Sequence, residues 1–97
     1  MGHEFLINVK LTSIERQEVA RLFKRKAAYY QTNVIDKTEF YEFKNNIFKE
    51  RMPDLTISFD EKGIYVCKYL KSDLWSDLED LKSYLQLNGK GFTVEEL

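Results

Sequence analysis

Side chains that can do nucleophilic or metal chemistry are sparse in this 97-residue chain, which has one histidine, His3, and one cysteine, Cys67. A nucleophilic serine, threonine or cysteine needs a base within reach, and a histidine so close to a chain terminus is poorly placed to serve as one. A single cysteine forms neither an intramolecular disulfide nor a thiolate metal cluster. We therefore expect a protein that is not an enzyme and that uses no metal or other cofactor.

Carboxylate pairs are the remaining candidates for acid–base chemistry. Asp60 and Glu61 fall in a predicted hairpin turn, where aspartate is favoured for local hydrogen bonding. Asp77 and Asp80 fall on the solvent side of a predicted helix, near its N-terminus, where acidic side chains suit the helix dipole. The sequence has no calcium-loop spacing and no glycine-rich phosphate loop. Neither pair indicates catalysis.

The densest cluster of cations lies in RLFKRKAAYY, residues 21–30. At 100° per residue, Arg21, Lys24 and Arg25 share the solvent side of a helix and are the candidate nucleic-acid contact. The neighbouring Tyr30 falls on the apolar side and is not free to stack on bases. The cluster is therefore typical of an ordinary amphipathic helix.

Lys26 is the exception, because it projects from within the apolar arc of that helix. Its stem either packs while the ammonium reaches water, or the ammonium pairs with a carboxylate.

Charge is segregated along the chain, although the net charge is only −1. Residues 10–51 hold ten Lys and Arg against six Asp and Glu, whereas residues 52–97 hold five against nine. A basic helix lying near an acidic one explains this pattern, and so does a polar surface for a partner. The overall pI of about 5.8 is low for a dedicated nucleic-acid binder.

The first half of the chain predicts a strand and two helices. Residues 5–11 alternate between apolar and polar side chains, as a half-buried strand does. Thr12 and Glu15 have the spacing of a capping box, which predicts a helix over residues 13–31. Asp36 and Glu39 repeat that spacing and predict a second helix over residues 37–51. A strand over residues 39–44 is the competing interpretation, because aromatic side chains are dense there.

The second half predicts a hairpin of residues 55–60 and 64–70. If Gly63 takes the left-handed position of a three-residue loop, Asp60 pairs with Ile64. The covered face then carries Leu55, Ile57, Phe59, Tyr65, Cys67 and Tyr69. The open face carries Leu6, Asn8, Lys10, Thr56, Ser58, Ile64 and Val66, without an aromatic side chain for base stacking.

The chain is expected to close with a helix over residues 74–87, capped by Asp73. Residues 92–97 form either a short edge strand or an unpaired tail. Together the elements predict one α+β domain over residues 1–97, with two layers. We expect a mainly antiparallel sheet of three or four strands, with three helices on one face, in the order β-α-α-β-β-α.

A compact domain whose sequence carries no catalytic, metal or cofactor signature is expected to act by binding another macromolecule. We expect a non-enzymatic protein-binding module, such as a small inhibitor or immunity-type protein that blocks the surface of a basic partner. The candidate protein contact is the acidic helix surface, Asp73, Asp77, Glu79 and Asp80.

Nucleic-acid binding through Arg21, Lys24 and Arg25 is the alternative, and self-association through the open sheet or its edges is a third interpretation. Neither a signal peptide nor a membrane span is expected, and with a single cysteine the chain fits the cytoplasm.

Overall fold

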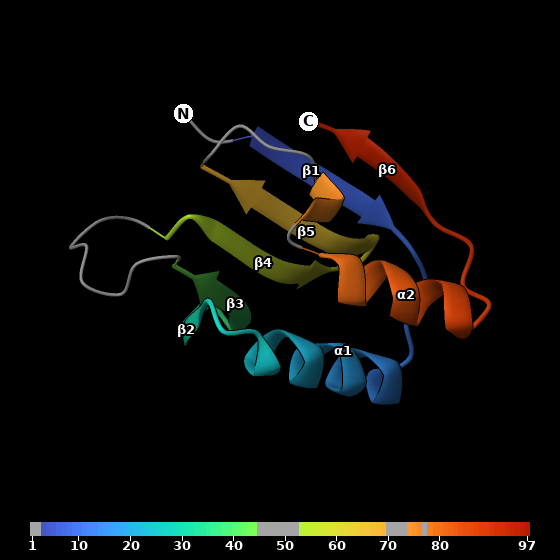
Figure 1. Cartoon of the computed structure of the whole chain (residues 1–97), viewed down its shortest axis with the longest axis horizontal. Helices are drawn as coiled ribbons and strands as arrows, with labels where there is room; N and C mark the ends of the chain where they lie inside the picture. The colour runs from blue at the N-terminus through green and yellow to red at the C-terminus, as the bar shows by residue number, and fades with distance from the viewer. Residues whose placement is uncertain (1–2, 45–52, 70–73, 77) are drawn as a thin grey trace.

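The computed structural model describes residues 3–44, 53–69, 74–76 and 78–97, and these residues form two layers (Figure 1). One layer is a six-stranded sheet in the order β2-β3-β4-β5-β1-β6, with every neighbouring pair antiparallel. The helices cover one face of that sheet (Figure 1). The elements, in chain order, are β1 (His3–Asn8), α1 (Ser13–Arg25), β2 (Tyr29–Ile35), β3 (Thr38–Phe43), β4 (Leu55–Asp60), β5 (Gly63–Lys68), the 3-10 turn η1 (Leu74–Ser76), α2 (Glu79–Leu87) and β6 (Thr93–Glu96).

The predicted α+β class with two layers holds, but the predicted count of elements is wrong. The described residues form six strands and two α-helices, not three helices on a sheet of three or four strands. The strand predicted over residues 55–60 is confirmed as β4, and the C-terminal residues form the short edge strand β6.

Helix α1 begins where the sequence predicts and ends six residues early. The Thr12 hydroxyl accepts from the Glu15 N–H, and the Glu15 carboxylate accepts from the Thr12 N–H, so the capping box is complete. The helix ends at Arg25, and Lys26 is already extended, with φ −68° and ψ 138°. The following residues pair as a strand, because the aromatic and β-branched side chains of YYQTNVI suit a sheet.

A hairpin replaces the predicted second helix. Asp36 and Lys37 have φ values of 49° and 67° and form a two-residue loop, since Ile35 pairs directly with Thr38. Positive φ at both loop residues is the geometry of a type I′ turn, whose twist matches that of the flanking strands. The competing interpretation, a strand over residues 39–44, is therefore confirmed through β3, whereas residues 45–52 lie outside the described residues.

This hairpin supplies aromatic side chains to the core. Tyr41 and Phe43 of β3 are each 2% exposed. Their ring centroids lie 5.5 and 6.1 Å from that of Phe23, which projects from α1. Rings at these separations in tilted and edge-to-face arrangements attract one another beyond their burial. The β2–β3 hairpin is thus fixed to α1 by aromatic packing.

The register of β5 differs from the prediction by one residue. Asp60 pairs with Gly63 and not with Ile64, so that Ile57 lies opposite Val66. Because side chains alternate across a sheet, this shift moves the whole of β5 to the other face. Ile64 and Val66 lie in the core, fully buried, and Tyr65 and Cys67 face away from the helices.

Gly63 is the reason that the shorter loop forms. It pairs with Asp60 on one side and with Asn8 on the other, at φ +149°. A Cβ at this position would lie 2.0 Å from the Ile7 carbonyl oxygen and 2.8 Å from the Val9 nitrogen. Only glycine therefore lets β5 approach β1 in this register.

The predicted third helix, over residues 74–87, is shorter than expected, because α2 begins only at Glu79. The described part of residues 74–87 consists of the turn η1 and the helix α2, and Asp73 and Asp77 lie outside the described residues. Leu78, Leu81 and Leu85 are fully buried, and α2 lies beside α1 on the sheet (Figure 1). Within the described ranges, neither helix has the length and apolar character needed to cross a membrane.

The contact between Gly63 and β1 makes a prediction about stability. Gly63→Ala should lower the free energy of unfolding by about 3 kcal/mol or more, because a backbone carbonyl occupies the place of the new methyl group. Gly89→Ala is the matched control: Gly89 has φ +65° with open space around it, and its replacement should cost about 1 kcal/mol. Urea denaturation measures both, and equal losses would contradict the close approach.

Candidate functional site

The face of the sheet opposite the helices carries a cluster of carboxylates and tyrosines. We call this cluster the acidic tyrosine surface. Its members are Glu4, Glu42, Tyr65, Cys67, Tyr69 and Glu95. The registers place Glu4 beside Cys67, Tyr65 beside Leu6, and Leu6 beside Glu95. Strands β1, β3, β5 and β6 and the residue that follows β5 thus contribute to one surface.

The tyrosine hydroxyls of this surface interact with its acids. The Tyr65 hydroxyl donates to Glu4, and both burial and this carboxylate raise the pKa of Tyr65 well above its ordinary value. Burial raises the pKa of Tyr69 as well, with further contributions from Cys67, Glu4 and Glu42. Both phenols are therefore protonated at neutral pH and can donate hydrogen bonds.

The described strand residues on this face carry acidic side chains but no basic ones. The described strand residues that alternate onto the face include four acids, Glu4, Glu42, Asp60 and Glu95, and none of these strand residues is Lys or Arg. Glu4 and Glu95 are exposed, and Tyr65 and Tyr69 are partly exposed. The surface therefore combines negative potential with amphipathic rings.

Sequence reasoning missed this surface because it placed Tyr65, Cys67 and Tyr69 on the covered face. The alternation in GIYVCKY was recognised, but not which set of residues faces the core. The signal that could have decided it is Gly63, since a glycine beside a short turn also suits a two-residue loop with a close neighbouring strand.

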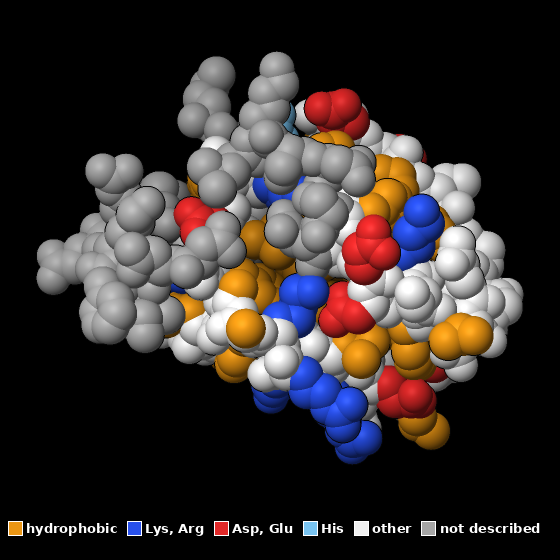
Figure 2. Space-filling view, viewed as in Figure 1, with side chains coloured by type: hydrophobic (Ala, Val, Ile, Leu, Met, Phe, Trp, Pro, Cys, Tyr) orange, Lys and Arg blue, Asp and Glu red, His pale blue; other side chains and the backbone are white. Residues whose placement is uncertain are grey.

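The predicted cations lie on the other side of the molecule. Arg21, Lys24 and Arg25 are exposed on α1, as the sequence predicts, and Figure 2 shows Lys and Arg side chains gathered over this helix. Phe23 is 1% exposed and belongs to the core. Tyr30 is 43% exposed, contrary to the prediction, because it lies in β2, where the Lys44 ammonium sits 4.1 Å from its ring centroid.

A hollow of about 430 Å³ adjoins these cations, with Arg16, Arg21 and Lys24 on its helix side. Arg16 already lies over the Phe59 ring and donates to the Asp60 carbonyl. The opposite side carries Glu39, which accepts a hydrogen bond from the Tyr41 hydroxyl. The cations of the hollow thus meet an acid across it.

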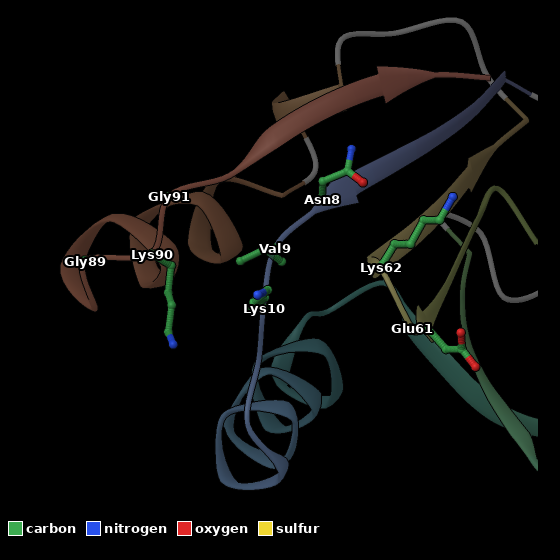
Figure 3. Close-up of a pocket in the computed structure, with 8 residues that line it drawn as sticks. All are labelled: Asn8, Val9, Lys10, Glu61, Lys62, Gly89, Lys90 and Gly91. Carbon is green, nitrogen blue, oxygen red and sulfur yellow. The ribbon is translucent and has the colours of Figure 1, made fainter.

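A larger hollow, of about 580 Å³, lies between the β1–α1 connection, the β4–β5 turn and the loop after α2 (Figure 3). Its charged residues do not converge. In Figure 3 the Lys90 side chain does not point toward Lys62 or Glu61, and Lys90 forms an ion pair with Glu15 at 2.8 Å. We see no arrangement there that would bind a particular ligand.

The predicted acidic helix surface is only partly available. Asp73 and Asp77 lie outside the described residues, and Glu79 is exposed on α2. Asp80 accepts a hydrogen bond from the Lys26 ammonium at 3.1 Å, which joins the end of α1 to the start of α2. Pairing with a carboxylate is thus what Lys26 does. Within the described ranges, no group of three or more His, Cys, Asp or Glu side chains could hold a metal ion.

The Lys26–Asp80 pair predicts a weak coupling. Its side chains are 21% and 39% exposed, and ion pairs this close to water contribute about 0.5 kcal/mol. A double-mutant cycle with Lys26→Met and Asp80→Asn should give a coupling of that size at low salt, and a cycle of Lys26→Met with Glu79→Gln should give none. A coupling of zero would contradict this prediction, because the pair would then add nothing to stability.

Comparison with models of known families, with curated proteins and with solved structures finds no match.

Proposed function

We propose that the protein is a non-enzymatic binding module that covers a basic surface of another protein with its acidic tyrosine surface. The observation that carries the proposal is the gathering of Glu4, Glu42 and Glu95 with Tyr65 and Tyr69 on the face that the helices leave open. A small inhibitor or immunity-type protein acts in this way, by blocking the surface of its partner.

The tyrosines supply the contact area in this proposal. A tyrosine ring buries a large apolar surface with little loss of side-chain freedom, and its hydroxyl still hydrogen-bonds at the rim. Tyrosine is enriched among the residues that dominate binding energy at protein interfaces. Tyr65 and Tyr69 are partly exposed, and the Tyr65 hydroxyl is already held by Glu4, so the Tyr65 ring loses little freedom when a partner docks.

The carboxylates supply the choice of partner. Fixed negative charge accelerates encounter with a basic surface and disfavours acidic competitors. Glu4 and Glu95 lie on adjacent strands, joined through the pairing of Leu6 with Glu95. Arginines or lysines of a partner can therefore meet two carboxylates at once. A cytoplasmic location is part of this proposal, because a chain whose single cysteine is Cys67 forms no intramolecular disulfide and fits a reducing compartment.

Reversing the charge of the surface tests the proposal. Glu4→Lys with Glu95→Lys should remove the partner that wild type captures from the native host, because opposing cations would then face each other. Tyr65→Ala should weaken the same complex by about 30-fold, which corresponds to about 2 kcal/mol. Affinity capture with mass spectrometry identifies the partner, and calorimetry with that purified partner measures the loss.

The matched control is Glu79→Lys, which makes the same change on α2. Capture that survives Glu79→Lys and fails with the double reversal supports the acidic tyrosine surface. Capture that fails with Glu79→Lys alone would instead place the contact on the acidic helix surface. Circular dichroism of each variant shows whether the fold is retained.

Nucleic-acid binding through α1 is the second candidate, supported by the exposure of Arg21, Lys24 and Arg25 on one helix. Tyr65 and Tyr69 do not assist it, because phosphates approaching the open face would meet Glu4, Glu42 and Glu95. Binding would then rest on the cations of α1, without the tyrosines of the open face.

We accordingly expect wild type to leave single-stranded RNA and DNA unshifted in gels at about 50 mM salt. A shift that is lost on changing Arg21, Lys24 and Arg25 to Glu would favour the second candidate. The control changes Lys10, Lys37 and Lys62 to Glu, three exposed cations away from α1.

A further inference from the structure

The two edges of the sheet are protected very differently. Strand β6 has four residues, and two of them are glutamates, Glu95 and Glu96. Strand β2 has seven residues, YYQTNVI, and none of them is charged. Proteins usually protect an exposed edge with charge, proline, a bulge or a short strand, because an open edge is a template for another strand. In β2 the one such device is a bulge between Tyr29 and Gln31.

The unprotected part of β2 also exposes apolar side chains. Val34 is 61% exposed and Ile35 is 53% exposed. With Tyr30, they account for three of the seven large apolar side chains that are exposed in the described ranges. Val34 and Ile35 alternate to opposite faces of the sheet, so apolar side chains flank this edge on both sides.

Backbone geometry shows which groups this edge offers. Ile35 and Thr38 flank a two-residue loop and so form a hydrogen-bonded pair, and such pairs alternate along an antiparallel ladder. The N–H and C=O groups of Ile35, Asn33 and Gln31 then point toward β3. Those of Thr32 and Val34 point away from it, toward a neighbour on the open side.

We propose that this neighbour is the β2 edge of a second copy of the chain, paired antiparallel about a twofold axis at Asn33. In this register Thr32 of each copy lies opposite Val34 of the other, and both outward-pointing residues are hydrogen-bonded. Gln31 lies opposite Ile35, and the side chains of the two Asn33 residues face each other. Such an interface is closed and uses the same surface in both copies.

Charge favours a second copy over the other pairings. Two β2 strands bring no like charges together, whereas two β6 strands would bring Glu95 and Glu96 against their counterparts. The proposed register also points the Asp36 turn of one copy toward Tyr30 of the other, whose ring carries the Lys44 ammonium. The Asp36 carboxylate can then meet this ammonium at each end of the paired strands, and the same turn also carries the cation Lys37.

Sedimentation over a range of concentrations tests the proposal. Because few residues pair, we expect a weak dimer, with Kd on the order of 100 µM. Val34→Lys should keep the protein monomeric up to about 1 mM, a loss of at least about 10-fold in affinity, since it places a cation in the paired edge. Val94→Lys, the matched change on β6, should leave the dimer intact.

Three results would overturn the proposal: a wild type that stays monomeric at about 1 mM, a dimer unaffected by Val34→Lys, or a dimer lost with Val94→Lys. Unfolding in urea provides the check on folding, and Val34→Lys should leave it unchanged because the side chain is exposed.

Cross-linking tests the register with an independent variant. In a Cys67→Ser background, Asn33→Cys should form an intermolecular disulfide under mild oxidation, because the two side chains meet at the axis. Thr93→Cys on β6 is the matched control and should stay reduced. Cross-linking of Thr93→Cys without cross-linking of Asn33→Cys would overturn pairing through β2.

Discussion

The contact between the backbone of Gly63 and that of Ile7 is the constraint on which the rest of the structure depends. No side chain larger than hydrogen fits between these strands, so β5 sits in one register against both β1 and β4. That register places Ile64 and Val66 under the helices and Tyr65 and Cys67 on the open face. A change of one residue would reverse both faces, because side chains in a strand alternate.

The open face of the sheet consequently differs in charge from the exposed side of α1. The described strand residues on the open face include four acids and no Lys or Arg, whereas Arg21, Lys24 and Arg25 are exposed on α1. Some of the opposite charges pair within the molecule, as Lys26 does with Asp80. The acidic side has in addition the tyrosines that protein interfaces favour.

Local sequence signals predicted the elements that depend only on residues close together in the sequence. The capping box at Thr12 fixed the start of α1, and alternation identified β4. The same box spacing at Asp36 and Glu39 was misleading, because Asp36 in fact lies in a type I′ turn that lacks the glycine by which such turns are recognised. The candidate surface could not be predicted, since it depends on the register at Gly63, and that register depends on a neighbouring strand more than fifty residues earlier in the chain.

The most direct measurement of the central claim is the cross-strand NOE pattern of the β4–β5 hairpin by NMR. The structure requires a strong NOE between the α protons of Ile57 and Val66, with Phe59 similarly close to Ile64. An NOE from Ile57 to Cys67 in place of Val66 would contradict it, because Tyr65 and Tyr69 would then be buried and the proposed binding surface would not exist.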